Sequence, residues 1–364
     1  RIAGNGSVRV GGTGKVTFAA LPNGLVVEAG STVELNASSF GEAIAVNGAL
    51  TNRGTVVFAG AGSYLLGNDV VSTGQLIARD GAIVRMAEGI SHDATVTLGS
   101  ATLSLDGGAI TMPFVVDQWA YNCLSNSLPV TNVVGVLNGQ MQLTTPLGNL
   151  RSVACYRRKV STSQPFVLDL TFRGYGGGDG FAVLFHTDSR GPVALSSGWH
   201  KGISGLSPDF GFQYYLMSGN AYFGWVDNGN VTAWPSFDSP TDLFGQKGGA
   251  LFTARLSYDG ATMISEFWQN GNYAVLTNEQ AGVKLRALGE NAYLGLFGGT
   301  GGLTARQVVE TFSYVPQTTP SSAAMSIEVE AGKQAVLEGI STNMSVTLGD
   351  IILHDATRLT IDCA

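Results

Sequence analysis

Two segments far apart in the chain, EGISHDATVTLG at residues 88–99 and EGISTNMSVTLG at residues 338–349, share eight of their twelve residues. Both copies end in alternating apolar and polar residues, which is the period-two pattern of a β-strand. The offset of 250 residues is far too long for adjacent repeats. We therefore expect one repetitive structure that the chain leaves after about residue 113 and rejoins near residue 320.

The N-terminal flank repeats the same kind of unit at shorter intervals. Each unit is a glycine followed by a short alternating strand, as at residues 14–18, 30–35, 54–58 and 81–86. Strand starts every ~8–12 residues, without a helical pattern between them, are typical of a parallel β-helix or a sandwich. We favour the β-helix, because glycines allow tight corners and equivalent Val, Leu and Ile residues can stack into ladders. Aromatic residues are scarce in the flanks, which suits a narrow stack.

The composition excludes several classes of protein. Of 364 residues, 50 are Gly, 44% are hydrophobic and only 13% are charged, which excludes a disordered chain and a charge-rich helical bundle. The net charge is −7 and there is no basic stripe, so nucleic acid is not expected as a partner. No apolar run approaches the ~18–20 residues that span a membrane. The chain begins at Arg1 and ends within a strand-like pattern, and we interpret it as a piece of a longer protein.

The stretch VNGALTNRGTVVF at residues 46–58 resembles the Gly- and Asn-rich rungs of bacterial autotransporter passenger domains. The resemblance covers residues 1–113 and about 320–364. It implies a bacterial protein at the cell surface or outside the cell, with a β-helix that displays the central region. We expect three segments: a first β-helix part at 1–113, a central domain at 114–316, and a second β-helix part at 317–364.

The central region differs from the flanks, since all five Trp lie between residues 114 and 316. Its strand-like segments include, in order, WAYNC at 119–123, GGDGFAVLF at 177–185, LSYDG at 256–260 and FGGTGGL at 297–303. This order resembles the legume-type (L-type) lectin family over about residues 117–315. The resemblance implies an all-β, concanavalin-like jelly-roll sandwich of two antiparallel sheets, with a sugar site formed by loops at one end.

The resemblance also implies which residues bind carbohydrate. Asp179 matches the carboxylate that accepts hydrogen bonds from sugar hydroxyls, although it could instead cap its own turn. The late loop and an earlier glycine-rich loop would add backbone contacts, and two Trp near loops could stack on a pyranose ring, whereas Trp119 and Trp268 fit a core better. The further candidates are Gly299, Thr300, Gly301, Gly302, Gly202, Trp199 and Trp225.

The metal site of the family does not carry over to this sequence. Where family members place Glu and Asp, this chain has Gln213 and Tyr215, and the His position reads Tyr222. Calcium needs six to eight oxygen ligands, mostly carboxylates. The polar residues at 227–230 are close to this position, but they fit a hairpin turn as well as they fit a set of metal ligands. We expect no calcium, no manganese and no other cofactor, although in the family the metal orders the sugar-binding loops.

The cysteines leave two readings open. Cys123 and Cys155 could form a disulfide, which would suit an oxidising compartment, or they could be two buried, small apolar side chains. Cys363 is left over, and no Cys or His spacing indicates zinc.

Three functions follow from these patterns. The leading hypothesis is a metal-independent carbohydrate-binding module, related to adhesion, of a bacterial surface or secreted protein. The alternative is a structural or assembly module of a surface layer or filament that self-associates and has lost its sugar site. An enzyme acting on polysaccharide is a third hypothesis that we do not favour. The Glu-x-Asp-x-Glu run of jelly-roll glucanases is absent, and Glu266 stands alone.

Overall fold

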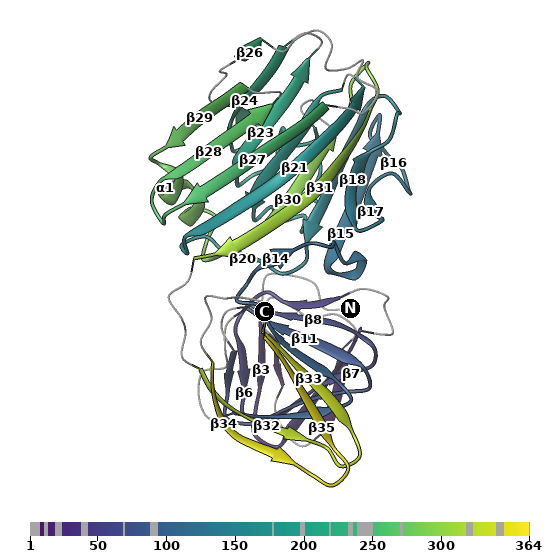
Figure 1. The fold of residues 1–364 in the computed structure, drawn as a ribbon, viewed down its shortest axis with the longest axis vertical. Coiled ribbons are helices and arrows are strands. Elements are labelled where there is room, and N and C mark those ends of the chain that lie inside the picture. Colours follow the sequence, from purple (N-terminus) through teal and green to yellow (C-terminus); the bar gives the residue numbers. More distant parts are fainter. Residues whose placement is uncertain are drawn as a thin grey trace. The chain divides into compact units, whose positions relative to one another are not determined.

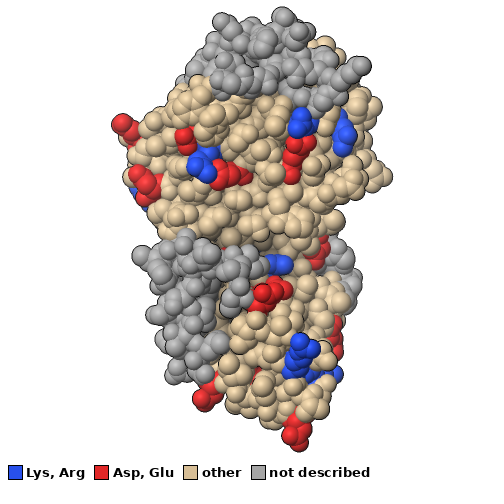
Figure 2. Space-filling model, in the orientation of Figure 1, with Lys and Arg blue, Asp and Glu red and all other residues tan. Residues whose placement is uncertain are grey.

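The computed structural model describes residues 8–10, 14–18, 24–37, 43–67, 70–87, 94–176, 178–196, 201–217, 220–231, 236–238, 250–269, 272–317, 323–339 and 346–363. The chain divides into two compact units, Arg1–Ala109 with Pro316–Ala364, and Ile110–Val315 (Figure 1). We call them the β-helix unit and the sandwich unit. No helix among the described residues is long and apolar enough to cross a membrane. Figure 2 shows mostly uncharged residues on one face, with basic and acidic side chains often beside one another.

The β-helix unit consists of three parallel sheets in its described part. The first contains β1 (Val8–Val10), β3 (Leu25–Val27), β6 (Leu50–Asn52) and β9 (Val70–Ser72). The second contains β2 (Gly14–Phe18), β4 (Ser31–Asn36), β7 (Thr55–Ala59), β10 (Gln75–Arg79), β12 (Ala94–Gly99), β32 (Ala323–Val329) and β34 (Val346–Leu353). The third contains β5 (Ile44–Val46), β8 (Gly62–Leu66), β11 (Ala82–Met86), β13 (Thr102–Leu105), β33 (Gln334–Gly339) and β35 (Arg358–Cys363). The predicted β-helix is confirmed.

Strands that precede the sandwich unit in the sequence pair directly with strands that follow it. In the second sheet β32 lies between β12 and β34, with Val96 opposite Ile327 and Met325 opposite Leu348. The C-terminal parts of the two sequence repeats therefore lie in β12 and β34, which are separated by a single strand, β32, in the same sheet. In the third sheet β13 pairs directly with β33. The other halves of the repeats, residues 88–93 and 340–345, lie outside the described residues.

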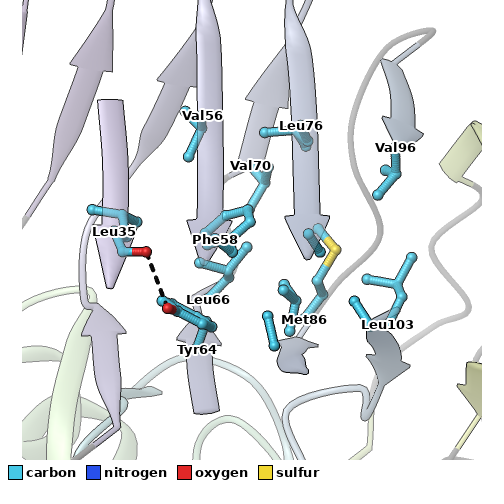
Figure 3. Packing of buried hydrophobic residues seen from close by; sticks show 14 of the residues in the cluster. Leu35, Val56, Phe58, Tyr64, Leu66, Val70, Leu76, Met86, Val96 and Leu103 are labelled. Atoms are coloured by element: carbon cyan, nitrogen blue, oxygen red, sulfur yellow. Dashed lines mark hydrogen bonds between the residues drawn. The ribbon is translucent and has the colours of Figure 1, made fainter. Parts of the chain in front are cut away.

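Stacked apolar ladders fill the interior of the β-helix unit. One ladder runs through the second sheet along consecutive register partners, each of them at most 4% exposed: Val33, Val56, Leu76, Val96 and Ile327. Figure 3 labels three of them, Val56, Leu76 and Val96. Burial of each such side chain stabilises the fold by about 1.5–3 kcal/mol. Strand alternation sends every second residue inward, which explains why the rungs read as period-two patterns.

An aromatic pair also fits inside the stack, contrary to the expectation that rings suit it poorly. Phe58 and Tyr64 are buried and meet edge to face with ring centroids 5.2 Å apart. The Tyr64 hydroxyl accepts from the Ala37 amide at 2.8 Å and lies 3.0 Å from the Leu35 carbonyl oxygen (Figure 3). Because its polar atom is paired, the ring can be buried without an unsatisfied group.

Glycines at the corners allow rungs to approach closely. A Cβ on Gly74 would lie 2.1 Å from the Gly54 carbonyl oxygen, and one on Gly54 would lie 2.4 Å from the Ser31 carbonyl oxygen. No side chain fits at such distances. Gly54 and Gly74 are thus required by the spacing of the stack, whereas Gly30 has open space around it and adopts a φ of +79°, which favours glycine.

The sandwich unit contains two mainly antiparallel sheets among its described residues. The eight-stranded sheet has β17 (Gly135–Leu137), β18 (Gln140–Thr144), β31 (Ala305–Pro316), β21 (Phe166–Gly176), β27 (Ala250–Tyr258), β28 (Met263–Gln269) and β29 (Asn272–Asn278) in order, with β14 (Ile110–Thr111) on β31. The ten-stranded sheet has β16 (Leu128–Pro129), β15 (Trp119–Ser125), β19 (Leu150–Tyr156), β30 (Asn291–Gly299), β22 (Gly180–His186), β23 (Asp209–Met217), β24 (Asn220–Asp227) and β25 (Asn230–Val231) in order. Short β20 (Val160–Ser161) pairs with β30, β26 (Ser236–Asp238) pairs with β24, and helix α1 (Ala281–Arg286) follows β29.

Aromatic side chains join the two sheets. Phe172 of β21 stacks on Phe181 of β22 with ring centroids 4.1 Å apart. Tyr214 of β23 lies against Phe252 of β27 and Phe267 of β28, at 4.9 and 4.6 Å. The predicted all-β fold class, a jelly-roll sandwich with β-helix segments, is confirmed. The concentration of aromatic residues in the central region reflects this core between sheets.

The disulfide reading is wrong, because the two cysteines face opposite sides of the ten-stranded sheet. Cys123 of β15 lies opposite Ser152, whereas Cys155 of β19 lies opposite Ala120, three positions away. Alternation therefore separates the two side chains, and both are free and buried. Burial raises the pKa of the Cys123 thiol to about 11 and also raises the pKa of the Cys155 thiol. The apolar reading of these cysteines holds.

Candidate functional site

Asp179 lies against the loop that follows β30. Its backbone amide donates to the Gly299 carbonyl at 3.1 Å. Its two carboxylate oxygens lie 3.1 and 3.2 Å from the position that a Cβ on Gly301 would occupy. A side chain at position 301 would be in tight contact with the carboxylate, which would have to shift by a few tenths of an ångström. The structure thus brings together Asp179, from the connection of β21 and β22, and the loop at 299–302.

Thr300 fixes this loop to the segment at 147–150 through hydrogen bonds. Its hydroxyl accepts from the Leu150 amide at 3.0 Å and donates to the Leu147 carbonyl at 2.6 Å. Its own amide donates to the Leu150 carbonyl at 2.9 Å. The side chain is 3% exposed, so its hydroxyl serves the loop rather than a ligand. Gly299 is also internal, because its carbonyl accepts from Asp179 and from the Gln307 amide group at 2.9 Å.

The outer part of the loop is open. A Cβ on Gly302 would meet nothing within 4 Å. In the described part of the chain, no acceptor is found for the amide groups of Gly301 and Gly302. Leu303 and Leu147 expose 55% and 51% of their surface beside the loop. The arrangement offers a carboxylate acceptor, backbone donors and apolar side chains within one group of connected segments.

A buried lysine, which the sequence analysis missed, lies under this loop. Lys201 is 1% exposed, and its Nζ donates to Gln213 Oε1 at 3.2 Å. Its Cα would lie 2.8 Å from a Cβ on Gly299, so the lysine backbone rests on that glycine. Burial lowers the pKa of the Lys201 ammonium to about 7, and the negative charge of Asp179 opposes part of this shift. A lone lysine in a glycine-rich loop gives no sequence signal of burial.

Gly202 shapes the turn that carries Lys201. Its φ of +79° is in the left-handed region that favours glycine. A Cβ there would lie 2.8 Å from Leu195 Cδ2 and 3.2 Å from Arg151 Cβ. Its carbonyl accepts from the Ser196 amide at 2.8 Å. Gly202 is thus close to the candidate site, with its carbonyl used inside the loop.

The proposed role of Trp225 in sugar stacking needs correction. Trp225 is 4% exposed, with its ring parallel to Phe210 at 5.9 Å and edge-on to Phe212 at 5.8 Å. It belongs to the core, because the alternation of β24 turns it inward. Trp119 is in the core as expected, whereas Trp268 is 37% exposed and not a core residue. Trp199 lies outside the described residues.

The residues at the positions that hold the metal ion in L-type lectins do not fit a divalent cation in this chain. Gln213 is fully buried, and its Oε1 already faces the ammonium of Lys201 at 3.2 Å. A cation beside that ammonium would be repelled. Among the described residues no group of three or more His, Cys, Asp or Glu could hold a metal ion. Asn228 and Gly229 form a two-residue hairpin turn with φ of +48° and +73°, which agrees with the turn reading of 227–230.

A second group of buried ionisable side chains lies at the far end of β22. His186 and Asp209 face each other across the β22–β23 pair, and both are at most 1% exposed. Burial lowers the pKa of His186 to about 4 and raises the pKa of Asp209 to about 7. Since Asp179 precedes β22 and His186 ends it, this group is separate from the loop at 299–302.

Comparisons with known proteins give similarity to solved structures alone. No family model matches the chain, and no curated protein matches it. The metal-free form of lectin I-B4 from Griffonia simplicifolia has 16% identity and a TM-score of 0.45, covering 58% of this chain and 99% of that chain. Lectin II from Ulex europaeus has 15% identity and a TM-score of 0.46, with the same coverage. A lectin from Bauhinia forficata in complex with GalNAc has 15% identity and a TM-score of 0.44, covering 57% of this chain and 96% of that chain. Likeness at this level carries no information on what this chain binds.

Proposed function

We propose that the chain is a carbohydrate-binding module and that its sandwich unit holds a glycan at Asp179 and the loop 299–303 without a metal ion. The observation that carries the proposal is the carboxylate of Asp179 resting against Gly301, where a Cβ would lie 3.1 Å from Oδ1. Sugars present neighbouring hydroxyl groups as donors, and a carboxylate accepts such bonds strongly. The order of sequence landmarks shared with L-type lectins supports the same assignment.

The surroundings of Asp179 suit the two kinds of surface on a pyranose ring. The amides of Gly301 and Gly302 can donate to sugar oxygens, since their acceptors are absent from the described residues. The exposed side chains of Leu147 and Leu303 can cover the apolar C–H face of the ring. A small number of placed polar groups within an apolar surround is the usual composition of a small-molecule site.

The proposed setting is the surface of a bacterial cell or its secreted proteins, with a role in adhesion. The support is the resemblance of residues 46–58 to autotransporter rungs. The β-helix unit would then display the sandwich unit, and the chain would act by binding rather than by catalysis. Glu266, the carboxylate considered for an enzyme, accepts from the Tyr273 hydroxyl at 2.7 Å on the face of β28 turned away from the core.

A glycan array tests the proposal. The chain is applied as wild type, as Asp179→Asn and as Glu279→Gln, which neutralises an exposed carboxylate beside α1 and serves as the matched control. We expect wild type and Glu279→Gln to bind the same glycans. Asp179→Asn should lose at least about tenfold in affinity, because hydrogen bonds to a charged group contribute about 1.5–3 kcal/mol. Binding that Asp179→Asn leaves unchanged would refute the site.

The same samples address the alternative, a structural module that self-associates. The observation that favours it is a group of apolar side chains on β27, β28 and β29 that are 37–51% exposed: Leu251, Ile264, Trp268, Tyr273 and Val275. Exposed apolar groups of this kind often mark interaction surfaces. Concentration-dependent association in sedimentation, together with no glycan bound by wild type, would favour the alternative over the carbohydrate-binding module.

A further inference from the structure

Lys201 is a fully buried ammonium that the binding scheme has not yet used. Lysine is almost never buried to this degree unless it is paired. A neutral amide oxygen, Gln213 Oε1 at 3.2 Å, is a weak compensation for a charge removed from water. The charge of Asp179 acts on it as well. Burial of this ammonium therefore lowers the stability of the fold, and the fold nevertheless keeps the cation close to the candidate binding carboxylate.

The contacts place the backbone and the start of the side chain of Lys201 against the strand end that precedes the binding loop. The backbone of Lys201 rests on Gly299, and the carbonyl of Gly299 accepts the amide of Asp179 at 3.1 Å. Gly299 also lies opposite Gly180, the residue after Asp179, in the β22–β30 pair. Lys201 thus touches the strand end to which Asp179 is fixed, and any movement of the lysine changes the support of that carboxylate.

We propose that Lys201 is a positioning residue for the glycan site: its buried ammonium supplies the positive charge that holds Asp179 against Gly301. A built-in cation then takes the place of a bound metal ion in ordering the loops. This inference rests on the proposed carbohydrate-binding function and assigns to that site its source of charge. It also explains why the position of Gln213 carries an amide, since a carboxylate there would compete with Asp179 for the ammonium.

Few other charged groups face Lys201 from the surrounding segments. Arg151 of β19 lies beside Gly202, with its Cβ 3.2 Å from the position of a Cβ on that glycine. The β23 side offers the neutral Gln213 and the β30 side offers Gly299. His200, the preceding residue, lies outside the described residues. Asp179 is therefore the carboxylate that acts on the ammonium among the described residues, and the pair should weaken when the ammonium loses its proton above about pH 7.

The first test needs no ligand. Hydrogen exchange is measured for the amides of Asp179 and Thr300, which are bonded to Gly299 and Leu150, as protection factors between pH 6 and 8.5. We expect wild-type protection to fall by about tenfold or more across this range, since a tenfold change is what about 1.4 kcal/mol of lost interaction produces. Lys201→Met should have low protection at every pH. A pH profile in Lys201→Met that matches the wild type would overturn the proposal.

A double-mutant cycle tests whether Lys201 acts through Asp179. The midpoints of denaturant unfolding are compared for wild type, Lys201→Met, Asp179→Asn and the double variant. Residues that interact directly give effects that do not add, so removal of the ammonium should change the midpoint differently when Asp179 is already neutral. Additive effects would overturn the proposal, and this readout remains valid even if Lys201→Met alters stability for other reasons.

Binding measurements separate this inference from the proposed function. On the array glycan with the highest signal, wild-type affinity should be unchanged by EDTA and should fall by about tenfold between pH 6 and 8.5. Lys201→Arg should keep binding at pH 8.5, because a guanidinium stays charged. If wild type binds no glycan while the exchange and cycle results hold, the proposed function fails and the Lys201–Asp179 coupling stands. If glycan binding is unaffected by Lys201→Met, the inference fails and the function stands. If glycan binding is lost in EDTA, the inference fails together with the metal-free mode of binding, and carbohydrate binding alone stands.

Discussion

The β-helix unit and the sandwich unit bury different kinds of polar group. Inside the β-helix, most buried polar side chains are neutral, such as Asn52 and Ser72, which are hydrogen-bonded to each other at 3.0 Å. The exception among its described residues is Asp106, which is 2% exposed and accepts from the Gly108 amide at 2.9 Å. The sandwich unit instead buries His186, Lys201 and Asp209, and burial moves the pKa of these groups to about 4, 7 and 7. Buried ionisable groups destabilise a fold and cluster at sites of function. The sandwich unit, for which we propose the binding function, thus holds more buried ionisable groups than the described part of the β-helix unit.

The largest effect that would sharpen this comparison is Gly74→Val. A Cβ at this corner would lie 2.1 Å from the Gly54 carbonyl oxygen, so neighbouring rungs must separate. We expect the β-helix unit to lose more than about 3 kcal/mol of stability while the sandwich unit keeps its own transition. Denaturant unfolding followed by Trp fluorescence, which reports the sandwich unit, and by circular dichroism, which reports both, measures this.

Gly339→Ala is the matched control for that change. A Cβ on Gly339 would meet nothing within 4 Å, and we expect a change within about 0.5 kcal/mol. Equal losses of stability in the two variants would show that the close approach at Gly74 does not limit the β-helix unit. Simultaneous loss of both transitions after Gly74→Val would show that the two units do not unfold independently.

The next effect in size is the pH dependence of the sandwich unit. The pKa of Lys201 is lowered to about 7 in the folded protein, below its ordinary value, so the unfolded chain binds more protons between about pH 7 and 10.5. The free energy of global unfolding should therefore rise with pH in this window, by at most about 1.4 kcal/mol per pH unit, even though the local contact between Lys201 and Asp179 weakens. Unfolding free energies of wild type and Lys201→Met from pH 7 to 10 check the sign, since the slope should be smaller in the variant. A larger slope in the variant would contradict the assignment.

The smallest of the three effects concerns Tyr64 inside the β-helix. Tyr64→Phe keeps the ring but leaves the buried amide of Ala37 without the acceptor that it now has at 2.8 Å. The expected loss is about 1–3 kcal/mol, measured by thermal or denaturant unfolding of the β-helix unit. Tyr273→Phe removes an exposed hydroxyl bonded to Glu266 at 2.7 Å and should cost less than about 0.5 kcal/mol. A larger loss of stability in Tyr273→Phe than in Tyr64→Phe would mean that buried hydrogen bonds do not determine the stability of the β-helix unit.

Repeated features of the fold were predictable from the sequence. The glycine-led strands of the flanks are spaced by the geometry of the rungs, and the repeat at 88–99 and 338–349 marks two positions in one stack. Within the candidate site, Asp179 and Gly301 were predicted to lie together only because the order of landmarks resembles that of L-type lectins, and no local pattern indicated it.

Features that depend on which face of a strand is buried were not predictable. Trp225 and Trp268 both lie in strands, yet Trp225 is 4% and Trp268 is 37% exposed, because alternation does not say which side faces the other sheet. The cysteine spacing did not reveal the register that separates Cys123 from Cys155. The burial of Lys201 depends on a glycine nearly a hundred positions later in the chain, and no local pattern records such a contact.

The pairing of β12 with β32 and of β13 with β33 has a mechanical consequence. A pull on the two ends of the β-helix passes from rung to rung through these pairs, so residues 110–315 lie outside the path of the load. The entry and exit of the inserted segment are also joined, because β14 pairs with β31 at Ile110 and Tyr314. Tension along the β-helix can therefore reach the breaking force of the rungs before it stretches the sandwich unit.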